Sequence, residues 1–561
     1  MNQIPVQDDL KSLQNEDEII QYLMREYLKG RYQFWLNKKC LVTLNPKYIL
    51  HKISPSNQDE IYHICRRGFQ ELKLTQAPIY FILNGLSGSG KTENSKLIIK
   101  NLLAYSKLDS NQVLIDSNTL LDLMGNAKTK YNANSSRFGK LIHINYNRDF
   151  SIINSEIEVY LLEKSRIIFK DLHAVDETFH IFKVLLANLS ENELSQNILP
   201  PNSDTKVEHS WSDIAQILSS RLHFTDDQIG EFKNILLVIL QLNLLKIEVE
   251  AGDSGLSSTK EGWRLKLIAS LLGVEREDLE EILLNNVTKP GPLKSSRRMT
   301  IYSTRCSYFE SICKRNSLLR FLYYGLFSFI VERVNDSLKS RVSIDQNYFC
   351  KIGILDMYGF ENMNENGFEQ FSINYANEVL HRLFVKTTID DYVNDMIEDG
   401  IADGNLSARD SEYPCLSAMD SIIDLLDQAC TLQRQSKTNS FTDSSRDPRE
   451  ISWINEMSLL FPIRPTKGNN RAVVKVTKST DQKNGFSIHH FAGQLTYTTR
   501  NFPEKNFDKI DLHSITKLFG NIQSNNEILS RIVQTHNPLN SDRHDQRKRV
   551  FSVLTNFKVR F

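Results

Sequence analysis

The chain contains 561 residues, of which 40% are hydrophobic and 24% are charged, a composition typical of a globular protein with a deep core. Its 68 Lys and Arg residues balance 68 Asp and Glu residues, so the net charge predicts no nucleic acid partner and no general attraction to a membrane. The seven cysteines stand singly with no CxxC pair, which predicts a reducing compartment and indicates neither a disulfide framework nor a zinc site.

The chain begins with a polar, acidic segment, residues 1–29, that lacks the pattern of a signal peptide. From residue 30 to residue 561, β-prone apolar runs alternate with long helical patterns, which predicts an α/β core with inserted helical subdomains. The longest apolar run, residues 235–245, is too short to span a bilayer and contains Gln241 and Asn243. It predicts a buried helix, no membrane insertion and a cytoplasmic protein.

The stretch GLSGSGKT, residues 85–92, has the GxxxxGK[ST] spacing of a phosphate-binding loop. An apolar run precedes it at 79–83 and a helix-forming run follows at 93–103, which is the context that the motif requires. The glycines let successive N–H groups point at phosphate oxygens, and the helix N-terminus adds partial positive charge. Lys91 is expected to reach the β- and γ-phosphates, and Thr92 to bind Mg²⁺. The nucleotide-binding residues predicted in the loop are Gly85, Leu86, Ser87, Gly88, Ser89, Gly90, Lys91 and Thr92. The loop alone does not distinguish ATP from GTP.

Two later stretches carry further ordered motifs. The segment at 125–146 contains NANSSRFGK, and the segment at 352–378 contains DMYGFE followed by FEQFSINYANE. With the loop, these stretches closely resemble the myosin motor family: the first is similar to its switch I and the second to its switch II, which runs into the relay helix. The resemblance covers about residues 30–557. It implies a P-loop NTPase core with a mixed, mainly parallel central sheet, an upper actin-side helical subdomain at 170–345, and switch II, relay helix and lower actin-side subdomain at 352–536.

The resemblance implies a set of ligands for the nucleotide and its metal. Asp356 follows a buried strand, where an acidic side chain holds Mg²⁺ through water, and Ser136 supplies a hydroxyl to the metal beside that of Thr92. Asn132 is expected to donate to phosphate oxygens. The Asn-Pro turn in CLVTLNPKYILHKI, residues 40–53, resembles the family's adenine-side turn and implies that Asn45 contacts the nucleotide.

The same resemblance implies the residues that perform the chemistry. Ser135 places a hydroxyl near the attacking water, and the Gly359 N–H meets the γ-phosphate, a contact that disappears after hydrolysis. Arg137 and Glu361 are expected to form a bidentate bridge that closes the back of the site and aligns water.

A run without Gly or Pro extends from residue 368 to residue 397, with apolar residues at helical spacing. It predicts one long helix beginning directly after switch II. This attachment favours a role in transmitting small movements of Gly359, although the same pattern also fits a plain core helix.

Several positions depart from the family pattern. Leu86 stands where the family has Glu, and Ser89 where it has Ala. Because the backbone of the loop makes the contacts to the phosphates, these changes predict that nucleotide binding is retained with altered rates. His51 and Ile53 replace the usual Pro and Tyr, so the selectivity for the nucleobase stays open.

The regions expected to meet actin also depart from the pattern. A polar stretch at 398–416 stands where the family has a Trp-bearing segment. A basic run either steers the chain onto acidic actin or forms an ordinary surface loop; it comprises Arg543, Arg547, Lys548 and Arg549. The sequence ends where the family's next helix opens, so we expect a divergent head truncated before the converter, without a light-chain-binding neck.

The motifs together favour a myosin-like, cytoskeleton-associated motor head that binds and hydrolyses Mg·ATP and couples phosphate sensing to actin binding. One alternative is a nucleotide-responsive actin tether or scaffold with little ATP turnover and no power stroke. Another P-loop NTPase, of the kinesin or GTPase type, fits less well because FEQFSINYANE after DMYGFE resembles myosin.

Overall fold

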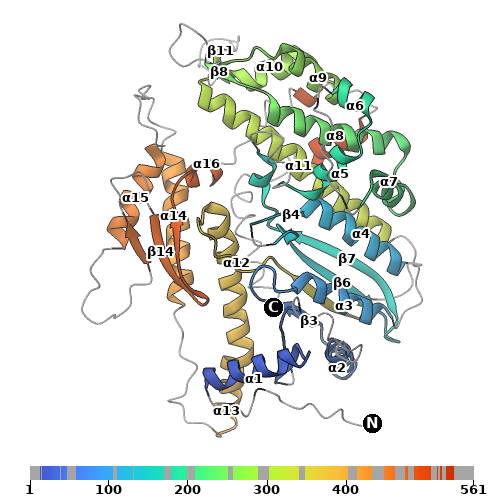
Figure 1. Cartoon of the computed structure of the whole chain (residues 1–561), viewed down its shortest axis with the longest axis vertical. Helices are drawn as coiled ribbons and strands as arrows, with labels where there is room; N and C mark the ends of the chain where they lie inside the picture. Colours follow the sequence, from blue (N-terminus) through green and yellow to red (C-terminus); the bar gives the residue numbers. More distant parts are fainter. Residues whose placement is uncertain are drawn as a thin grey trace, which may run out of the picture.

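The computed structural model describes residues 10, 13, 15–37, 39–46, 59–104, 110–130, 132–169, 178–197, 199, 207, 209–249, 257–288, 302–339, 348–401, 413–432, 448–461, 474–477, 485–506, 515, 518–520 and 526–535. Figure 1 shows three groups of elements: a central sheet with its helices beside the long helix α12, a helical bundle above the sheet, and a smaller group of helices and strands across α12.

The central sheet has the strand order β3–β12–β6–β7. Its strands are β3 (Ile79–Leu83), β12 (Cys350–Asp356), β6 (Gly139–Tyr146) and β7 (Ile152–Tyr160). The register places Asp356, the last residue of β12, opposite Leu83 on one side and Lys140 on the other. The ends of β3 and β12 and the start of β6 therefore meet at one edge of the sheet, where the chain leaves β3 for the GLSGSGKT loop.

The mixed character of the sheet is confirmed, but the expected parallel majority is not found among the described strands. β12 is parallel to β3 and antiparallel to β6, and β6 is antiparallel to β7. For β6 and β7 the reason is the short connection between them, because a tight hairpin can join only antiparallel strands. The Asn147 side chain closes that turn by accepting from the N–H groups of Asp149 (3.0 Å) and Ser151 (2.9 Å).

Helices pack against the first two strands of the order and against the last. α2 (Asp59–Thr75) and α3 (Lys91–Leu103) pack on each other and on β12. α11 (Tyr308–Lys339) packs on β7 and on α4 (Ser110–Gly125), and it crosses the molecule diagonally in Figure 1. The elements before α2 are α1 (Glu16–Leu28) and the hairpin of β1 (Gln33–Asn37) and β2 (Cys40–Thr43).

The upper bundle is built around α8 (Asp226–Leu244), which is confirmed as the buried helix expected from the apolar run. Its two polar core residues are satisfied: Gln241 donates to the Asn197 carbonyl (2.7 Å), and the Asn243 amide bonds both Ile167 and Phe169 of the main chain. The neighbouring elements are β4 (Asn126–Ala127), β5 (Ser135–Ser136), the 3₁₀ turn Lys164–Ile167, α5 (His180–Ala187), α6 (Glu191–Gln196), α7 (Trp211–Ser220), β8 (Glu248–Val249), β9 (Ser257–Ser258), α9 (Gly262–Leu272), α10 (Arg276–Leu284), β10 (Asn285–Thr288) and β11 (Tyr302–Arg305).

One element falls outside the group that the predicted division assigned to it. α18 (Glu527–Thr535), within the predicted lower segment 352–536, packs on α8 and α11 of the upper bundle. Its apolar face fits there because Gly325 of α11 has no side chain, and a Cβ at that position would lie 2.3 Å from Ile532. The buried Ile528 and Leu529 complete the same face. The other predicted boundaries stay predictions.

The smaller group of helices and strands lies across α12 from the sheet, at the left of Figure 1, and is called the lower cluster here. It contains α14 (Pro414–Leu432), α15 (Pro448–Leu460), α16 (Phe502–Asn506) and the antiparallel sheet of β13 (Val474–Thr477), β14 (Gly485–His490) and β15 (Gly493–Thr498). Its core is aromatic: the buried Trp453 stacks on Phe502 with ring centroids 5.1 Å apart. Phe371 of α12 meets Phe486 and Tyr497 edge to face, so α12 belongs to this core.

The predicted long helix is interrupted. α12 (Phe368–Val385) passes into a π-helical segment (Lys386–Asp390), and α13 (Asp391–Glu398) follows. The hydroxyls of Thr387 and Thr388 donate to the carbonyls of Leu383 and Phe384, where they compete with the regular i→i−4 ladder.

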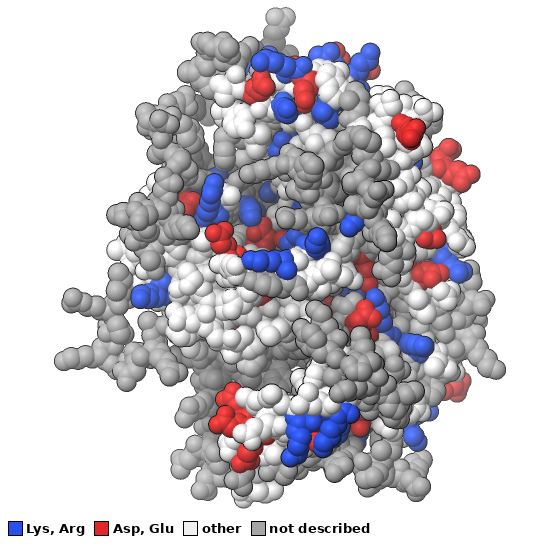
Figure 2. Space-filling model, in the orientation of Figure 1, with Lys and Arg blue, Asp and Glu red and all other residues white. Residues whose placement is uncertain are grey.

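Across the described residues, no helix is both long enough and apolar enough to cross a bilayer. On the face shown in Figure 2, basic and acidic side chains are interspersed over the described surface, in keeping with the balanced charge of the whole chain. The basic run at 543–549 lies outside the described residues, as do His51, Ile53 and most of the polar stretch 398–416.

Candidate functional site

The predicted phosphate-binding loop connects β3 to α3, as the motif requires. Gly90 caps α3 with φ +96°, a left-handed conformation that a residue with a side chain rarely adopts, so the chain can turn directly into the helix. Lys91, the first residue of α3, directs its Nζ back over the loop to the carbonyls of Gly85 (3.0 Å) and Leu86 (2.7 Å). Burial lowers the pKa of Lys91 to about 8, although the carboxylates of Asp356 and Glu361 oppose that shift.

Switch II, residues 356–361, runs directly against this loop. Leu86 and Phe360 form a parallel bridge, and the Ser87 N–H donates to the Phe360 carbonyl (3.2 Å). A Cβ on Gly359 would lie 2.4 Å from Ser87 N, Lys91 Nζ and the Leu86 carbonyl carbon. Only glycine permits this close approach of switch II to the loop. The predicted contact of the Gly359 N–H with a phosphate stays a prediction. The Leu86 side chain itself is 58% exposed, which fits a position whose backbone faces the site.

The predicted metal ligands converge at the start of α3. The Thr92 hydroxyl lies 3.3 Å from that of Ser136, which switch I brings from the other side. Asp356 is buried, and neither of its carboxylate oxygens has a hydrogen-bond partner among the described residues. Burial raises the pKa of Asp356, and the nearby charges of Lys140 and Lys91 oppose that shift. A buried carboxylate beside two hydroxyls, of which that of Thr92 also opposes the rise of the Asp356 pKa, is the donor set that a hard divalent cation such as Mg²⁺ prefers, so these residues fit the metal.

Switch I, residues 132–140, contributes the remaining polar groups. The Ser135 hydroxyl lies 3.5 Å from that of Ser87 in the loop. A Cβ on Gly88 would lie 3.9 Å from the Asn132 side chain, so this side chain lies next to the loop at Gly88. The Asn45 amide donates to the Gly88 carbonyl (2.7 Å), which ties the turn after β2 to the same loop.

Ser89, the remaining predicted loop residue, packs inside the loop. Its N–H donates to the Leu86 carbonyl (3.2 Å), and its hydroxyl faces Gly85. Ser89 therefore stabilises the turn of the loop from inside.

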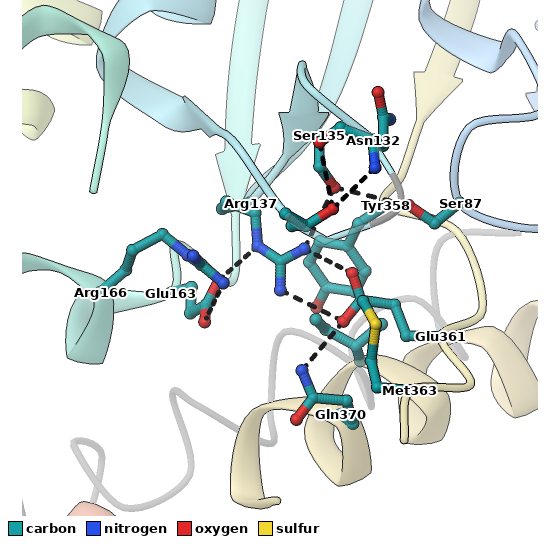
Figure 3. Close-up of polar contacts among 12 residues, drawn as sticks. Ser87, Asn132, Ser135, Arg137, Glu163, Arg166, Tyr358, Glu361, Met363 and Gln370 are labelled. Atoms are coloured by element: carbon teal, nitrogen blue, oxygen red, sulfur yellow. Dashed lines mark hydrogen bonds and ion pairs between the residues drawn. The ribbon is translucent and has the colours of Figure 1, made fainter. Parts of the chain in front are cut away.

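Arg137 and Glu361 join the two switches, as Figure 3 shows. Arg137 Nη1 and Nη2 lie 2.5 and 3.3 Å from the two oxygens of Glu361, which is the bidentate arrangement expected from the motifs. Both side chains are fully buried. Arg137 Nη1 also donates to the Ser135 hydroxyl (3.1 Å), so the ion pair positions the hydroxyl predicted to face the water.

The structure adds partners that the motifs do not reveal. Glu163 accepts from Arg137 Nε on the side opposite Glu361, and Arg166 in turn bonds Glu163 (2.9 Å). Gln370 of α12 donates to the second oxygen of Glu361 (3.1 Å). The sequence EIEVYLLEKSRI does contain Glu163 and Arg166 three residues apart, which predicts a local ion pair. Only the fold shows that this pair touches Arg137.

A strand–loop–helix with Lys-Thr at the helix start, beside an Asp that ends the neighbouring buried strand, is the phosphate-binding core of a P-loop NTPase. A family model for the myosin head (motor domain) matches residues 50–558. Among the similar proteins are the myosin IB heavy chain of Dictyostelium discoideum, 28% identical over 90% of this chain and 46% of the relative, and unconventional myosin-Ia of Gallus gallus, 28% identical over 88% of this chain and 48% of the relative. Myosin-VIIa of Drosophila melanogaster is 29% identical over 97% of this chain and 25% of the relative.

The chain therefore belongs to the myosin head (motor domain) family, and the resemblance of its motifs is confirmed. It spans about half the length of the first two relatives and a quarter of the third.

Proposed function

We propose that this chain is an actin-based motor head that binds Mg·ATP and hydrolyses it between the loop and the two switches. The observation that carries the proposal is the buried bidentate pair of Arg137 and Glu361, because it joins switch I to switch II behind the loop. A closed back wall confines a water molecule next to the phosphate and excludes bulk solvent.

In this proposal the loop binds the phosphates through its backbone N–H groups and through Lys91, with Asn132 donating from switch I. Asn45 holds the loop from the nucleobase side through its bond to Gly88. Thr92, Ser136 and, through water, Asp356 would hold Mg²⁺, which would supply positive charge to the phosphate oxygens.

The catalytic roles fall to residues of both switches. Ser135, fixed by Arg137, orients the attacking water, and the Gly359 N–H donates to the γ-phosphate. Glu361 holds Arg137 in place and is itself fixed at both ends: Gln370 bonds its carboxylate, and Asn374 bonds its main chain. Loss of the γ-phosphate would remove the Gly359 contact. Because α12 begins at Phe368, nine residues after Gly359, a movement of Gly359 would reach the start of this helix.

The alternative function is a nucleotide-responsive actin tether with little turnover. It is favoured by Leu86 and Ser89, which replace the residues usual in the family's loop, and by the polar stretch at 398–416 in the expected actin contact. The two functions share the nucleotide site and differ in the rate of hydrolysis.

Phosphate release with and without filamentous actin distinguishes them. We expect steady release by the wild type, accelerated by actin, and a fall of about 100-fold or more in Lys91→Ala, because Lys91 supplies charge at the phosphates. Lys100→Ala, an exposed residue of the same helix, is the matched control and should behave like wild type. Wild-type release no faster than that of Lys91→Ala, combined with ATP-sensitive pelleting with actin, would establish the tether in place of the enzyme. No pelleting in either nucleotide state would reject actin as the partner.

A further inference from the structure

A second group of potential ligands lies in the lower cluster, apart from the nucleotide site. Glu378 of α12, Cys415 of α14 and His490 of β14 each offer one ligand atom, and these atoms all lie within 4.8 Å of one another. His490 Nδ1 lies 2.8 Å from Glu378 Oε1 and 3.7 Å from Cys415 Sγ. We call these three residues the Glu–Cys–His triad. They come from three different elements that are far apart in sequence, so no motif of short sequence spacing indicates them.

The distances in the triad are close to those of a tetrahedral zinc centre. Zinc bonds of roughly 2.0 Å to nitrogen and oxygen and roughly 2.3 Å to sulfur place neighbouring ligand atoms about 3.3 to 3.6 Å apart. The separation of Sγ and Nδ1, 3.7 Å, exceeds the upper end of this range by about 0.1 Å. The carboxylate of Glu378, whose Oε1 also accepts from the Phe491 N–H (3.0 Å), would need to withdraw from Nδ1 by about 0.5 Å.

The charge and burial of the triad also suit a dication. Glu378 and His490 are buried. A thiolate and a carboxylate together neutralise one divalent cation, so the loaded site buries no net charge. Thiolate and imidazole select zinc over Mg²⁺ or Ca²⁺, which prefer oxygen ligands. Cys415 is only half-buried, so the triad is accessible to solvent from the side of its thiol.

The imidazole of His490 has the second partner that metal-binding histidines usually have. The Tyr497 hydroxyl lies 2.8 Å from Nε2, and Asn374 donates to that hydroxyl (3.0 Å). Asn374 also bonds the N–H and the carbonyl of Glu361, both at 2.8 Å. A continuous chain of hydrogen bonds therefore connects the triad to the end of switch II.

We propose that the Glu–Cys–His triad is a binding site for a thiophilic divalent cation, with Zn²⁺ as its ligand and water as the fourth ligand. On binding, the thiol proton is released to solvent, and the ring proton of the neutral imidazole moves from Nδ1 to Nε2. Nε2 then donates to Tyr497 instead of accepting from it, and the ion ties α12 to α14 and β14. Occupancy of the site is thereby linked to the hydrogen bonds that hold Glu361.

The test uses Co²⁺ as a spectroscopic substitute for Zn²⁺, with the whole chain and excess Mg²⁺ but no nucleotide. We expect a thiolate-to-cobalt charge-transfer absorption that appears at one equivalent, disappears when Zn²⁺ is added, and is absent in Cys415→Ser. Cys313→Ser, at a half-buried cysteine elsewhere, should retain the absorption. Tyr497→Phe should weaken the apparent Zn²⁺ affinity by about tenfold or more, because the residue orients His490.

A second measurement needs no variant. Zn²⁺ should protect Cys415 of the wild type from alkylation, followed by mass spectrometry of its peptide, without protecting the half-buried Cys40. Absence of the cobalt band in the wild type, an unchanged band in Cys415→Ser, or equal alkylation of Cys415 with and without Zn²⁺ would each overturn the proposal and leave a purely hydrogen-bonded cluster. None of these readouts uses ATP, so they are independent of the proposed function.

Discussion

The Arg137 guanidinium is fully buried between two carboxylates, Glu163 and Glu361, and also donates to Ser135. Burial lowers the pKa of Arg137, but the two carboxylates outweigh it and raise that pKa overall. For Glu163, burial raises the pKa, and the charges of Arg137 and Arg166 outweigh it and hold the pKa at about 2. Glu163 therefore contributes stability in the ionised form, in addition to positioning Arg137.

At the scale of this residue we predict the effect of Glu163→Gln. Because the folded pKa of Glu163 lies below its ordinary value of 4.5, its stabilisation is complete above about pH 4.5 and is lost as the pH falls towards about 2. The variant should be less stable than wild type by about 2 to 3 kcal/mol at pH 7, and the gap should narrow on acidification. Urea unfolding followed by circular dichroism between pH 7 and pH 3 measures this. Glu277→Gln, an exposed glutamate of α10, should show no such gap; a gap in Glu163→Gln that stays constant with pH would contradict the account.

Among the elements, α12 connects the nucleotide site to the lower cluster. Asn374, fully buried on α12, accepts from the Glu361 N–H and donates to the Glu361 carbonyl and to Tyr497. One side chain thus holds the end of switch II to both α12 and β15. The π-helical segment Lys386–Asp390 lies beyond this attachment, so α12 is a regular helix where it meets switch II.

We predict that Asn374→Ala destabilises the chain by about 2 to 4 kcal/mol, because it leaves buried main-chain groups of Glu361 without partners. Phosphate release should fall as well, since Glu361 loses its position relative to Arg137. The matched variant is Ser372→Ala, whose exposed hydroxyl bonds only within the helix as far as the described contacts go. Equal stability of the two variants in thermal unfolding would argue against this role for Asn374.

For the whole molecule, α12 lies between the sheet and the lower cluster, and the upper bundle packs on the sheet through α11 and β7 (Figure 1). Contacts of switch II with the loop and with Asn374 connect the loop to the lower cluster, whereas α9 and α10 pack with each other and with α8 and α11 of the upper bundle. We therefore predict that nucleotide binding affects the lower cluster and leaves α9 and α10 unaffected.

Hydrogen exchange measured by mass spectrometry tests this at the same scale. A non-hydrolysed Mg·ATP analogue should slow exchange in residues 84–92, in both switches and in β14–β15, and leave α9 and α10 unchanged. Lys91→Ala at the same analogue concentration should show none of these changes. Protection confined to the loop in wild type would mean that switch II does not transmit the signal.

Much of this arrangement was predictable from sequence, for identifiable reasons. The loop, Asp356, Arg137 and Glu361 lie in ordered local motifs, so their proximity follows once each motif is placed at a strand end. The π-helical segment was not predictable because threonines also occur in regular helices, where their hydroxyls bond the same carbonyls. The proximity of Glu163 to Arg137, the placement of α18 on α11 and the Glu–Cys–His triad depend on long-range packing, which no spacing along the chain encodes.

The central claim is that the loop and both switches form one ATP-hydrolysing site that closes through Gly359. Single-turnover cleavage of γ-labelled ATP tests it most directly, with wild type compared with Gly359→Ala. A Cβ at this position would lie 2.4 Å from three loop atoms, so switch II must move away from the loop in the variant. We predict that both proteins bind ATP and that only the wild type cleaves it at an appreciable rate, with a difference of about 100-fold or more. Equal cleavage by the two proteins, or no cleavage by the wild type, would contradict the account.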